Sequence, residues 1–170
     1  GSLWRYWELL PLVDWEMAVT FGEGWTPLIP LNRFGSAIAL SNVYLKDERQ
    51  GPTATFKDRQ ATVAISFLKE QGINELVLAS TGNVAIAYSA YAARAGIQVY
   101  AFFPEGVAPS KIKEARLYGA KVMAVEGTYD QAKAMAAQFA ADQGIFLDQG
   151  IKTFAGVESM KTMGFEIAEQ

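Results

Sequence analysis

The fold of this chain is decided by one run of residues, Glu75-Leu76-Val77-Leu78-Ala79-Ser80-Thr81-Gly82-Asn83. Its first half is a short and almost wholly apolar stretch, which is typical of a strand buried on both faces of a parallel sheet. A helical spacing of apolar residues follows over 84–95, and Gly96 is placed to end that helix. A buried strand, a short turn and a helix form the repeating unit of α/β sheets.

The same unit recurs along the chain. Strands are expected over 43–46, 98–103 and 121–125, and helices over 58–71, 109–118 and 129–142. A loop is expected over 152–156 and a further helix over 158–170. Each helix is followed by a glycine that can stop it: Gly72, Gly96, Gly119 and Gly144. Right-handed crossovers then give an α/β fold, a doubly wound and mostly parallel sheet with helices on both faces in three layers. Loops at the carboxyl ends of the strands form its crevice.

Composition excludes several classes of function. The chain of 170 residues is 51% hydrophobic and has a net charge of −3, without a basic patch or a long apolar run. We therefore expect no nucleic-acid partner, no membrane partner, no secretory signal and a cytoplasmic location. The chain has no cysteine and no histidine, which excludes disulfides, thiolate chemistry and nearly every zinc site, so no metal site is expected.

A lysine near the start of the first long helix is a candidate catalytic residue. Lys57 lies in the turn Gly51-Pro52-Thr53-Ala54-Thr55-Phe56-Lys57-Asp58-Arg59, between the strand over 43–46 and the helix over 58–71. The helix dipole and partial burial both disfavour an ammonium ion at this place. A neutral lysine amine can attack an aldehyde and form a Schiff base. From the spacing alone, a solvated lysine on the helix shoulder is the simpler interpretation.

Two further loops are expected at the same edge of the sheet, because they also follow strands. In Ser80-Thr81-Gly82-Asn83, small hydroxyls, a permissive glycine and free amides at a helix start suit an anion. Capping of the helix would also explain the choice of Ser80 or Asn83. The segment over 105–111 is interpreted as a plain turn with helix-starting chemistry.

Several motifs together resemble one family. The stretch from Gly51 to Arg59 resembles the Asn-Pro-Thr-Gly-Ser-Phe-Lys-Asp-Arg motif of the threonine synthases, which are fold-type II (tryptophan synthase β-like) pyridoxal-phosphate enzymes. The similarity extends almost from end to end. Further matching stretches are Trp4-Arg5-Tyr6, Gly22-Glu23-Gly24-Trp25-Thr26-Pro27-Leu28, Ser80-Thr81-Gly82-Asn83, Tyr118-Gly119-Ala120, Glu126-Gly127-Thr128-Tyr129-Asp130, Lys161-Thr162 and Phe165-Glu166-Ile167.

The resemblance implies a cofactor, a substrate and their ligands. Lys57 would hold pyridoxal 5'-phosphate and move protons, Phe56 would line the pocket, and Asn83 would hydrogen-bond the cofactor's ring oxygen. The substrate carboxylate would be received by Ser80, Thr81 and the Gly82 amide. The implied reaction converts O-phosphohomoserine and water to threonine and phosphate, in an enzyme expected to be a homo-oligomer.

The motif departs from the family pattern at three positions. Gly51 replaces asparagine, Ala54 replaces glycine and Thr55 replaces serine. The change at Ala54 matters most, because an alanine resists the positive φ angle that a glycine adopts freely. Residues 154–161 also diverge from the family's usual run.

Family members have a catalytic region about twice as long, formed by two α/β domains. We therefore expect a fragment, with residues 1–2 a cloning scar, 3–42 a strap and loop packed on the domain, and 43–150 the lysine-bearing βα domain. Residues 151–170 would begin a second domain, which is missing and carries the phosphate cup. Alone, such a chain is expected to bind pyridoxal phosphate weakly and to have no turnover.

Three alternatives remain open. The chain could belong to a serine/threonine dehydratase or a cysteine synthase of the same fold. It could be a non-catalytic α/β binding or assembly module that self-associates through exposed apolar surface. A nucleotide-binding Rossmann module is a third alternative, although no Gly-x-Gly-x-x-Gly follows the first strand.

Overall fold

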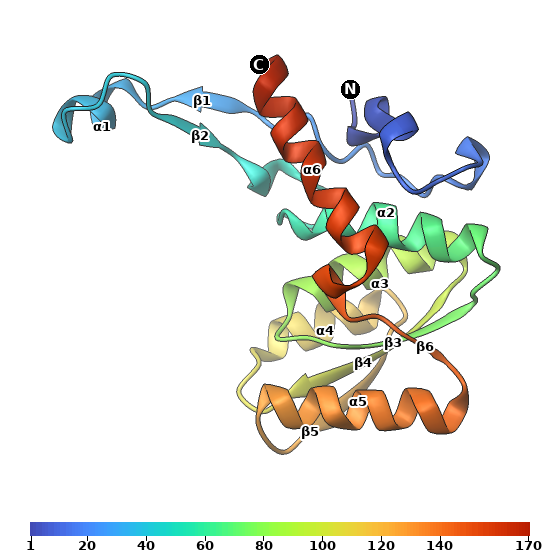
Figure 1. The fold of residues 1–170 in the computed structure, drawn as a ribbon. Helices are drawn as coiled ribbons and strands as arrows, with labels where there is room; N and C mark the ends of the chain where they lie inside the picture. Colours follow the sequence, from blue (N-terminus) through green and yellow to red (C-terminus); the bar gives the residue numbers. More distant parts are fainter.

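The computed structural model describes residues 1–170 and centres on a parallel sheet. Its four strands lie in the order β5-β4-β3-β6 (Figure 1). Their bounds are β3 Glu75–Ala79, β4 Gln98–Pro104, β5 Lys121–Val125 and β6 Phe146–Leu147. The strand order reverses between β3 and β6, since β4 and β5 lie on one side of β3 and β6 on the other. Such a reversal is where α/β sheets open a crevice.

Helices cover both faces of this sheet. Helix α5 (Tyr129–Gln143) lies on one face, whereas α3 (Asn83–Ala95) and α4 (Pro109–Leu117) lie on the other, with α2 (Lys57–Glu70) beside α3 (Figure 1). Alternate residues of β3 serve the two cores: Leu76 and Leu78 join the larger core under α2 and α3, and Val77 joins the smaller core under α5. The predicted three-layer, doubly wound parallel sheet is confirmed.

The predicted repeat is confirmed almost residue by residue. Strands β3 and β5 have the expected bounds, and the ends of α2 to α5 differ from expectation by at most one residue. The stop glycines adopt the left-handed backbone that a helix end requires, with φ of 74° at Gly96 and 66° at Gly144. Local sequence signals therefore determine the body of the fold.

The strand expected over 43–46 lies elsewhere. Strand β2 (Tyr44–Lys46) pairs antiparallel with β1 (Leu28–Pro30) and has no bond to the parallel sheet. With α1 (Asn32–Ala37) between them, the two strands form an arm that projects from the body (Figure 1). A partner close in sequence costs less loop-closure entropy than a place in the sheet. The prediction that Lys57 follows a strand of the parallel sheet is therefore wrong.

The last helix is longer than expected. Helix α6 runs from Phe154 to Glu169, so the loop expected over 152–156 is wrong for its last three residues. Thr153 explains the early start, because its side chain accepts a hydrogen bond of 3.3 Å from the Gly156 amide and caps the helix. Helix α6 packs across α2 (Figure 1). The division of the chain into domains at residues 43 and 151 stays a prediction.

The N-terminal segment packs on the body as short 3-10 helices, η1 (Leu3–Leu9) and η2 (Trp15–Met17). Trp4 is buried, and its indole Nε1 donates to Thr62 Oγ1 of α2 over 2.9 Å. Core packing therefore accounts for this aromatic residue. Two more 3-10 turns, η3 (Glu48–Gln50) and η4 (Gly150–Lys152), precede α2 and α6. No helix here combines the length and apolarity needed to cross a bilayer.

Candidate functional site

Lys57 is the first residue of α2, and its side chain is half-buried. Its Nζ lies 4.1 Å from the centroid of the Phe56 ring, and the amine takes part in no ion pair. Burial lowers the pKa of Lys57 below that of a free lysine. An amine that is partly desolvated and lacks a counter-ion can act as a nucleophile or a base.

The turn before α2 explains why Lys57 has no counter-ion. The neighbouring carboxylate of Asp58 is buried and turned away, where it accepts hydrogen bonds from the amide (2.9 Å) and hydroxyl (2.7 Å) of Thr53. In this arrangement a Cβ at position 51 would clash with the Asp58 carboxylate, so Gly51 permits the close approach seen here. The turn is thus held by Asp58, and Lys57 is left unpaired.

Ala54 adopts the backbone that the family pattern assigns to glycine. Its φ angle is 55°, in the left-handed region that costs an L-residue about 1–2 kcal/mol. The alanine has therefore not changed the turn, and the structure carries strain there instead. The next residue, Thr55, places its hydroxyl 3.5 Å from the side-chain amide of Asn83. This contact brings the Lys57 turn next to the Ser80–Asn83 loop.

Ser80 faces inward. Its hydroxyl is buried and accepts hydrogen bonds from the amides of Gly82 (3.0 Å) and Ala85 (3.1 Å), so it caps α3. Thr81 and Asn83 are exposed, and the amides of Thr81, Asn83 and Val84 donate no hydrogen bond within the chain. Three free amides at a helix start favour an anion. The exposed part of the loop suits an anion, while Ser80 and the Gly82 amide are occupied within it.

Lys111 is a cation that sequence reasoning missed at this loop. It lies in the first turn of α4, and a Cβ on Gly82 would clash with its Cδ and lie 3.1 Å from its Nζ. The φ angle of 139° at Gly82 favours glycine, and the missing Cβ lets Lys111 approach the loop. Lys111 makes no ion pair. A positive charge therefore lies beside the free amides.

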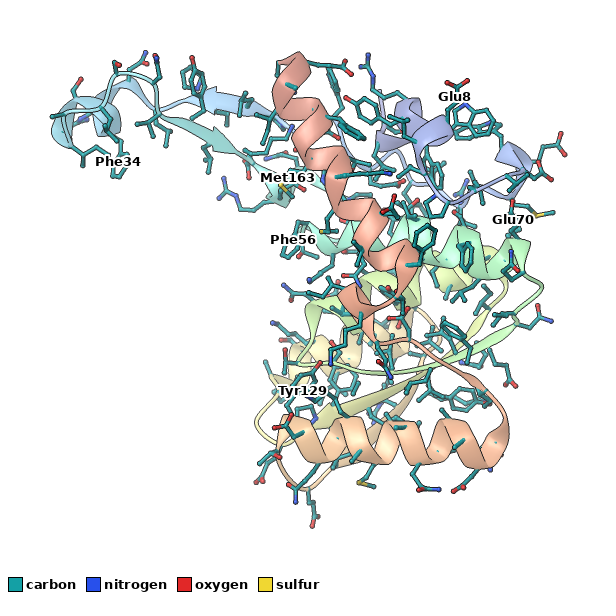
Figure 2. All side chains as sticks on the ribbon, viewed as in Figure 1. Glu8, Phe34, Phe56, Glu70, Tyr129 and Met163 are labelled. Atoms are coloured by element: carbon teal, nitrogen blue, oxygen red, sulfur yellow. The ribbon has the colours of Figure 1, made fainter.

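The sheet edge with this site is shown in Figure 2. Phe56 and Tyr129 lie on the same side of the molecule, where α2 and α5 begin. The Tyr129 hydroxyl donates to the carbonyl of Ala79, the residue before Ser80, over 3.4 Å. The predicted residues thus gather at one edge of the body, although Lys57 reaches it from a turn outside the sheet.

A buried cluster of charges anchors the first turn of α2. Arg59 is 1% exposed, and its Nη1 and Nη2 donate to the Glu166 carboxylate of α6 over 2.6 and 2.7 Å. Its Nε and Nη2 also donate to Glu48 over 2.7 and 2.8 Å. The remaining bonds go to Thr26 (3.1 Å) and Thr162 (3.2 Å). Every nitrogen of the guanidinium is therefore bonded.

Glu166 gathers donors from three segments. It accepts bonds from Arg59, from Lys46 of β2 (2.8 Å) and from the amides of Trp25 (2.7 Å) and Thr26 (3.3 Å). Burial alone would raise the pKa of Glu166, but the bonds from Arg59 and Lys46 outweigh it and lower the pKa to about 2. The cluster holds the arm and α6 against the helix that begins at Lys57.

This arrangement fits pyridoxal phosphate. An unpaired, half-buried lysine suits its aldehyde, and the Phe56 ring provides an aromatic wall. The exposed Asn83 amide, 3.5 Å from the Thr55 hydroxyl of the same turn, is a hydrogen-bond donor. The donor set also lacks groups that would suit a metal, since no cluster of three metal-binding side chains is present.

The chain belongs to the family of pyridoxal-phosphate dependent enzymes, whose sequence model matches residues 19–170. A threonine synthase of Methanosarcina acetivorans is 41% identical over 99% of this chain and 41% of its own length. A threonine synthase of Halalkalibacterium halodurans is 36% identical over 99% of this chain and 48% of its own length. The chain thus spans less than half the length of these relatives. The resemblance to the family and its cofactor are confirmed.

Solved structures share the fold at lower identity. Threonine deaminase isoform 2 from Solanum lycopersicum has a TM-score of 0.80 and 22% identity over 99% of this chain and 45% of that chain. Diaminopropionate ammonia lyase from Escherichia coli in complex with D-serine has a TM-score of 0.82 and 18% identity. The match covers 89% of this chain and 46% of that chain. These likenesses show the fold of a fold-type II enzyme.

Sequence reasoning missed residues of two kinds. For Lys111 a signal existed, because a lysine in the first turn of a helix opposes the dipole just as Lys57 does. For the pair of Arg59 and Glu166 no local signal existed, since the two residues are 107 positions apart. Charge type can be read from sequence, but the partner of a buried charge depends on the tertiary fold.

Proposed function

We propose that this chain supplies the lysine-bearing part of a pyridoxal-phosphate dependent threonine synthase, a carbon–oxygen lyase that converts O-phosphohomoserine and water to threonine and phosphate. The observation that carries the proposal is the unpaired, half-buried amine of Lys57 beside the Ser80–Asn83 loop. The threonine synthase relatives, similar over 99% of this chain, support the choice of reaction.

Lys57 has two tasks in this reaction. Its Nζ binds the cofactor and then accepts and returns protons at the substrate carbons, which requires a neutral amine. The buried position of the amine and the absence of a counter-ion favour that state. When bound, the cofactor supplies an electron sink for the carbanions that these proton transfers create. Phe56 beside the amine limits the access of water.

The loop after β3 receives the anionic end of the substrate. The free amides of Thr81 and Asn83, with Lys111 beside them, favour a carboxylate held there. Ser80 and the Gly82 amide shape the loop instead of binding the substrate, because the Gly82 amide donates to the Ser80 hydroxyl. The exposed side-chain amide of Asn83, whose one bond is the long contact with Thr55, donates to the cofactor ring.

The proposal is tested by the absorbance spectrum after addition of pyridoxal phosphate, before and after reduction with borohydride. In the full-length protein we expect an absorbance band near the visible edge that disappears on reduction, leaves the cofactor covalently attached, and is absent in Lys57→Ala. Lys69→Ala is the matched control, since it removes a lysine from the last turn of the same helix and is expected to leave the band unchanged. A band that survives Lys57→Ala would contradict the role of Lys57.

The substrate is tested with the full-length protein by comparing O-phosphohomoserine with threonine and O-acetylserine. Release of phosphate with formation of threonine is expected. Turnover of threonine or O-acetylserine alone would assign the chain to the dehydratase or cysteine synthase type instead. We further propose a cytoplasmic homo-oligomer, which sedimentation analysis would check.

A further inference from the structure

A second buried polar group lies behind the site and has no part in the chemistry above. Asp148 follows β6, and its side chain lines a cavity of about 540 Å³ at the carboxyl ends of β3 and β6. Its Oδ1 accepts a hydrogen bond from the Gly150 amide over 2.7 Å. Its Oδ2 accepts a bond from the hydroxyl of Tyr88 on α3 over 3.3 Å.

The chain of hydrogen bonds continues to α2. Gln60 donates from Nε2 to the Tyr88 hydroxyl over 3.2 Å, and its own Oε1 is buried without a partner. Gln60 lies one turn after Lys57, Tyr88 is on the helix that begins at Asn83, and Asp148 lines the cavity. The three residues thus connect the elements that carry the site. All three are at most 6% exposed.

Which groups donate and which accept in this chain of hydrogen bonds depends on one proton. Tyr88 has a single hydroxyl proton, so it can donate to Asp148 only while Oδ2 is a bare acceptor. A protonated Oδ2 donates to the Tyr88 oxygen instead, and the Tyr88 proton then needs the Oε1 of Gln60 as its acceptor. Gln60 provides it by turning its amide over. Its Oε1 has no partner in the present orientation, so turning the amide over breaks only the bond from Nε2 to Tyr88.

We propose that Asp148 is a positioning residue of the site, acting through a hydrogen-bond chain whose direction reverses when its carboxyl takes up a proton. Its effect reaches α2 through Tyr88 and Gln60 and ends one turn from Lys57. The link to Lys57 rests on the proposed function, whereas the reversal of the chain does not.

The charges around Asp148 favour uptake of a proton in an accessible range. Burial raises the pKa of the Asp148 carboxyl to about 6, against the lowering effect of the bonds from Gly150 and Tyr88. Burial also raises the pKa of Tyr88, which keeps its proton. The other ionisable groups on the wall of the cavity are Tyr129 and Lys133 of α5 and Lys152 of η4. The apolar side of Asp148, toward Phe67 and Phe146, has none.

The reversal is tested by NMR titration of the side-chain carboxyl of Asp148 and the side-chain amide of Gln60, without cofactor. Both signals are expected to shift with one midpoint at about pH 6. Asp148→Asn, whose amide donates to Tyr88 as the protonated acid would, is expected to hold the Gln60 signal at its low-pH position at every pH. Asp142→Asn, at an exposed carboxylate of α5, is the matched control and is expected to leave the Gln60 titration unchanged.

Tyr88→Phe provides a second variant. It removes a donor to the ionised carboxyl, so the midpoint of Asp148 is expected to rise and the Gln60 signal to stop titrating. The proposed chain of hydrogen bonds would be refuted by a Gln60 signal that still follows Asp148 in Tyr88→Phe. A midpoint of Asp148 equal to that of a free aspartate would also refute it.

The positioning role has its own readout, the pH profile of acylation of Lys57 relative to Lys69. A step in this ratio at about pH 6 that is lost in Asp148→Asn is expected. A ratio without that step would refute the positioning role even if the chain reverses, and neither readout needs bound cofactor.

Discussion

Two neighbouring residues of α2 lead into two different buried polar clusters. Arg59 enters a cluster in which every guanidinium nitrogen and both Glu166 oxygens are bonded. Gln60 enters a cluster that leaves its Oε1 without a partner. A saturated cluster has one arrangement and fixes the elements that it joins, whereas an unsaturated one retains a choice. The cluster at Arg59 therefore fixes helix α2 in one arrangement, whereas the cluster at Gln60 permits two hydrogen-bond arrangements.

Loss of Arg59 should break the saturated cluster most severely. Arg59→Met leaves Glu48 without a cation and the buried Glu166 with Lys46 alone, and breaking such a buried pair typically costs about 3–5 kcal/mol. We expect that reduction in the free energy of unfolding from urea denaturation. Arg116→Met, at an exposed position on α4, should leave the midpoint unchanged. Equal effects of the two substitutions would show that the buried cluster contributes no more than a surface charge.

The two clusters should respond to pH with opposite signs. Glu166 has a lowered pKa of about 2, so its contribution is complete above the unfolded value near 4.5 and is lost as the pH falls toward 2. Asp148 has a raised pKa of about 6, so the folded protein binds its proton more tightly and stability declines as the pH rises from about 4 to 6. Each cluster therefore has its own pH window.

Asp148→Asn should remove the second of these effects. At about pH 7 we expect the free energy of unfolding to rise by about 1–3 kcal/mol, because an ionised carboxylate no longer has to be buried. The decline between about pH 4 and 6 should also disappear, while the loss of stability in stronger acid remains. Thermal unfolding across pH checks both points. A variant that is less stable than the parent at neutral pH would mean that the ionised carboxylate is well solvated.

The smallest expected effect concerns the turn that leads into both clusters. Ala54→Gly should raise the free energy of unfolding by about 0.5–1 kcal/mol, because glycine adopts the φ angle of 55° without strain. Ala134→Gly, in the exposed part of helix α5, should lower it by about 1 kcal/mol. Denaturation midpoints of the pair compare the two directly. A loss in both would show that Ala54 is not strained.

The sequence predicted the βα body well because its signals are local. Apolar runs and stop glycines define each strand and helix by themselves, as at Gly96 and Gly144. The motif residues Lys57 and Asn83 also come together as expected, and their roles stay predictions. The partner of β2 could not be predicted in the same way, because the sequence of a three-residue strand does not indicate which strand it pairs with.

The buried polar clusters were beyond prediction for a different reason. Asp148 follows a two-residue strand in a segment without any recognisable motif, and its environment is made by α3 and α2. Arg59 belongs to a recognised motif, yet its partner Glu166 lies on the last helix. A buried charge is defined by what surrounds it, and those surroundings exist only once the elements are assembled.

The bond between Glu166 and the Trp25 amide spans 141 positions of the chain. A contact between residues so far apart in sequence is non-local, and we expect it to form late in the folding of this segment. During synthesis the arm and α2 are made before α6. Arg59 and Lys46 therefore lack the Glu166 carboxylate until α6 has been synthesised. Because Glu166 bonds Arg59 in the first turn of α2, we expect docking of α6 to stabilise the helix start that carries the reactive lysine.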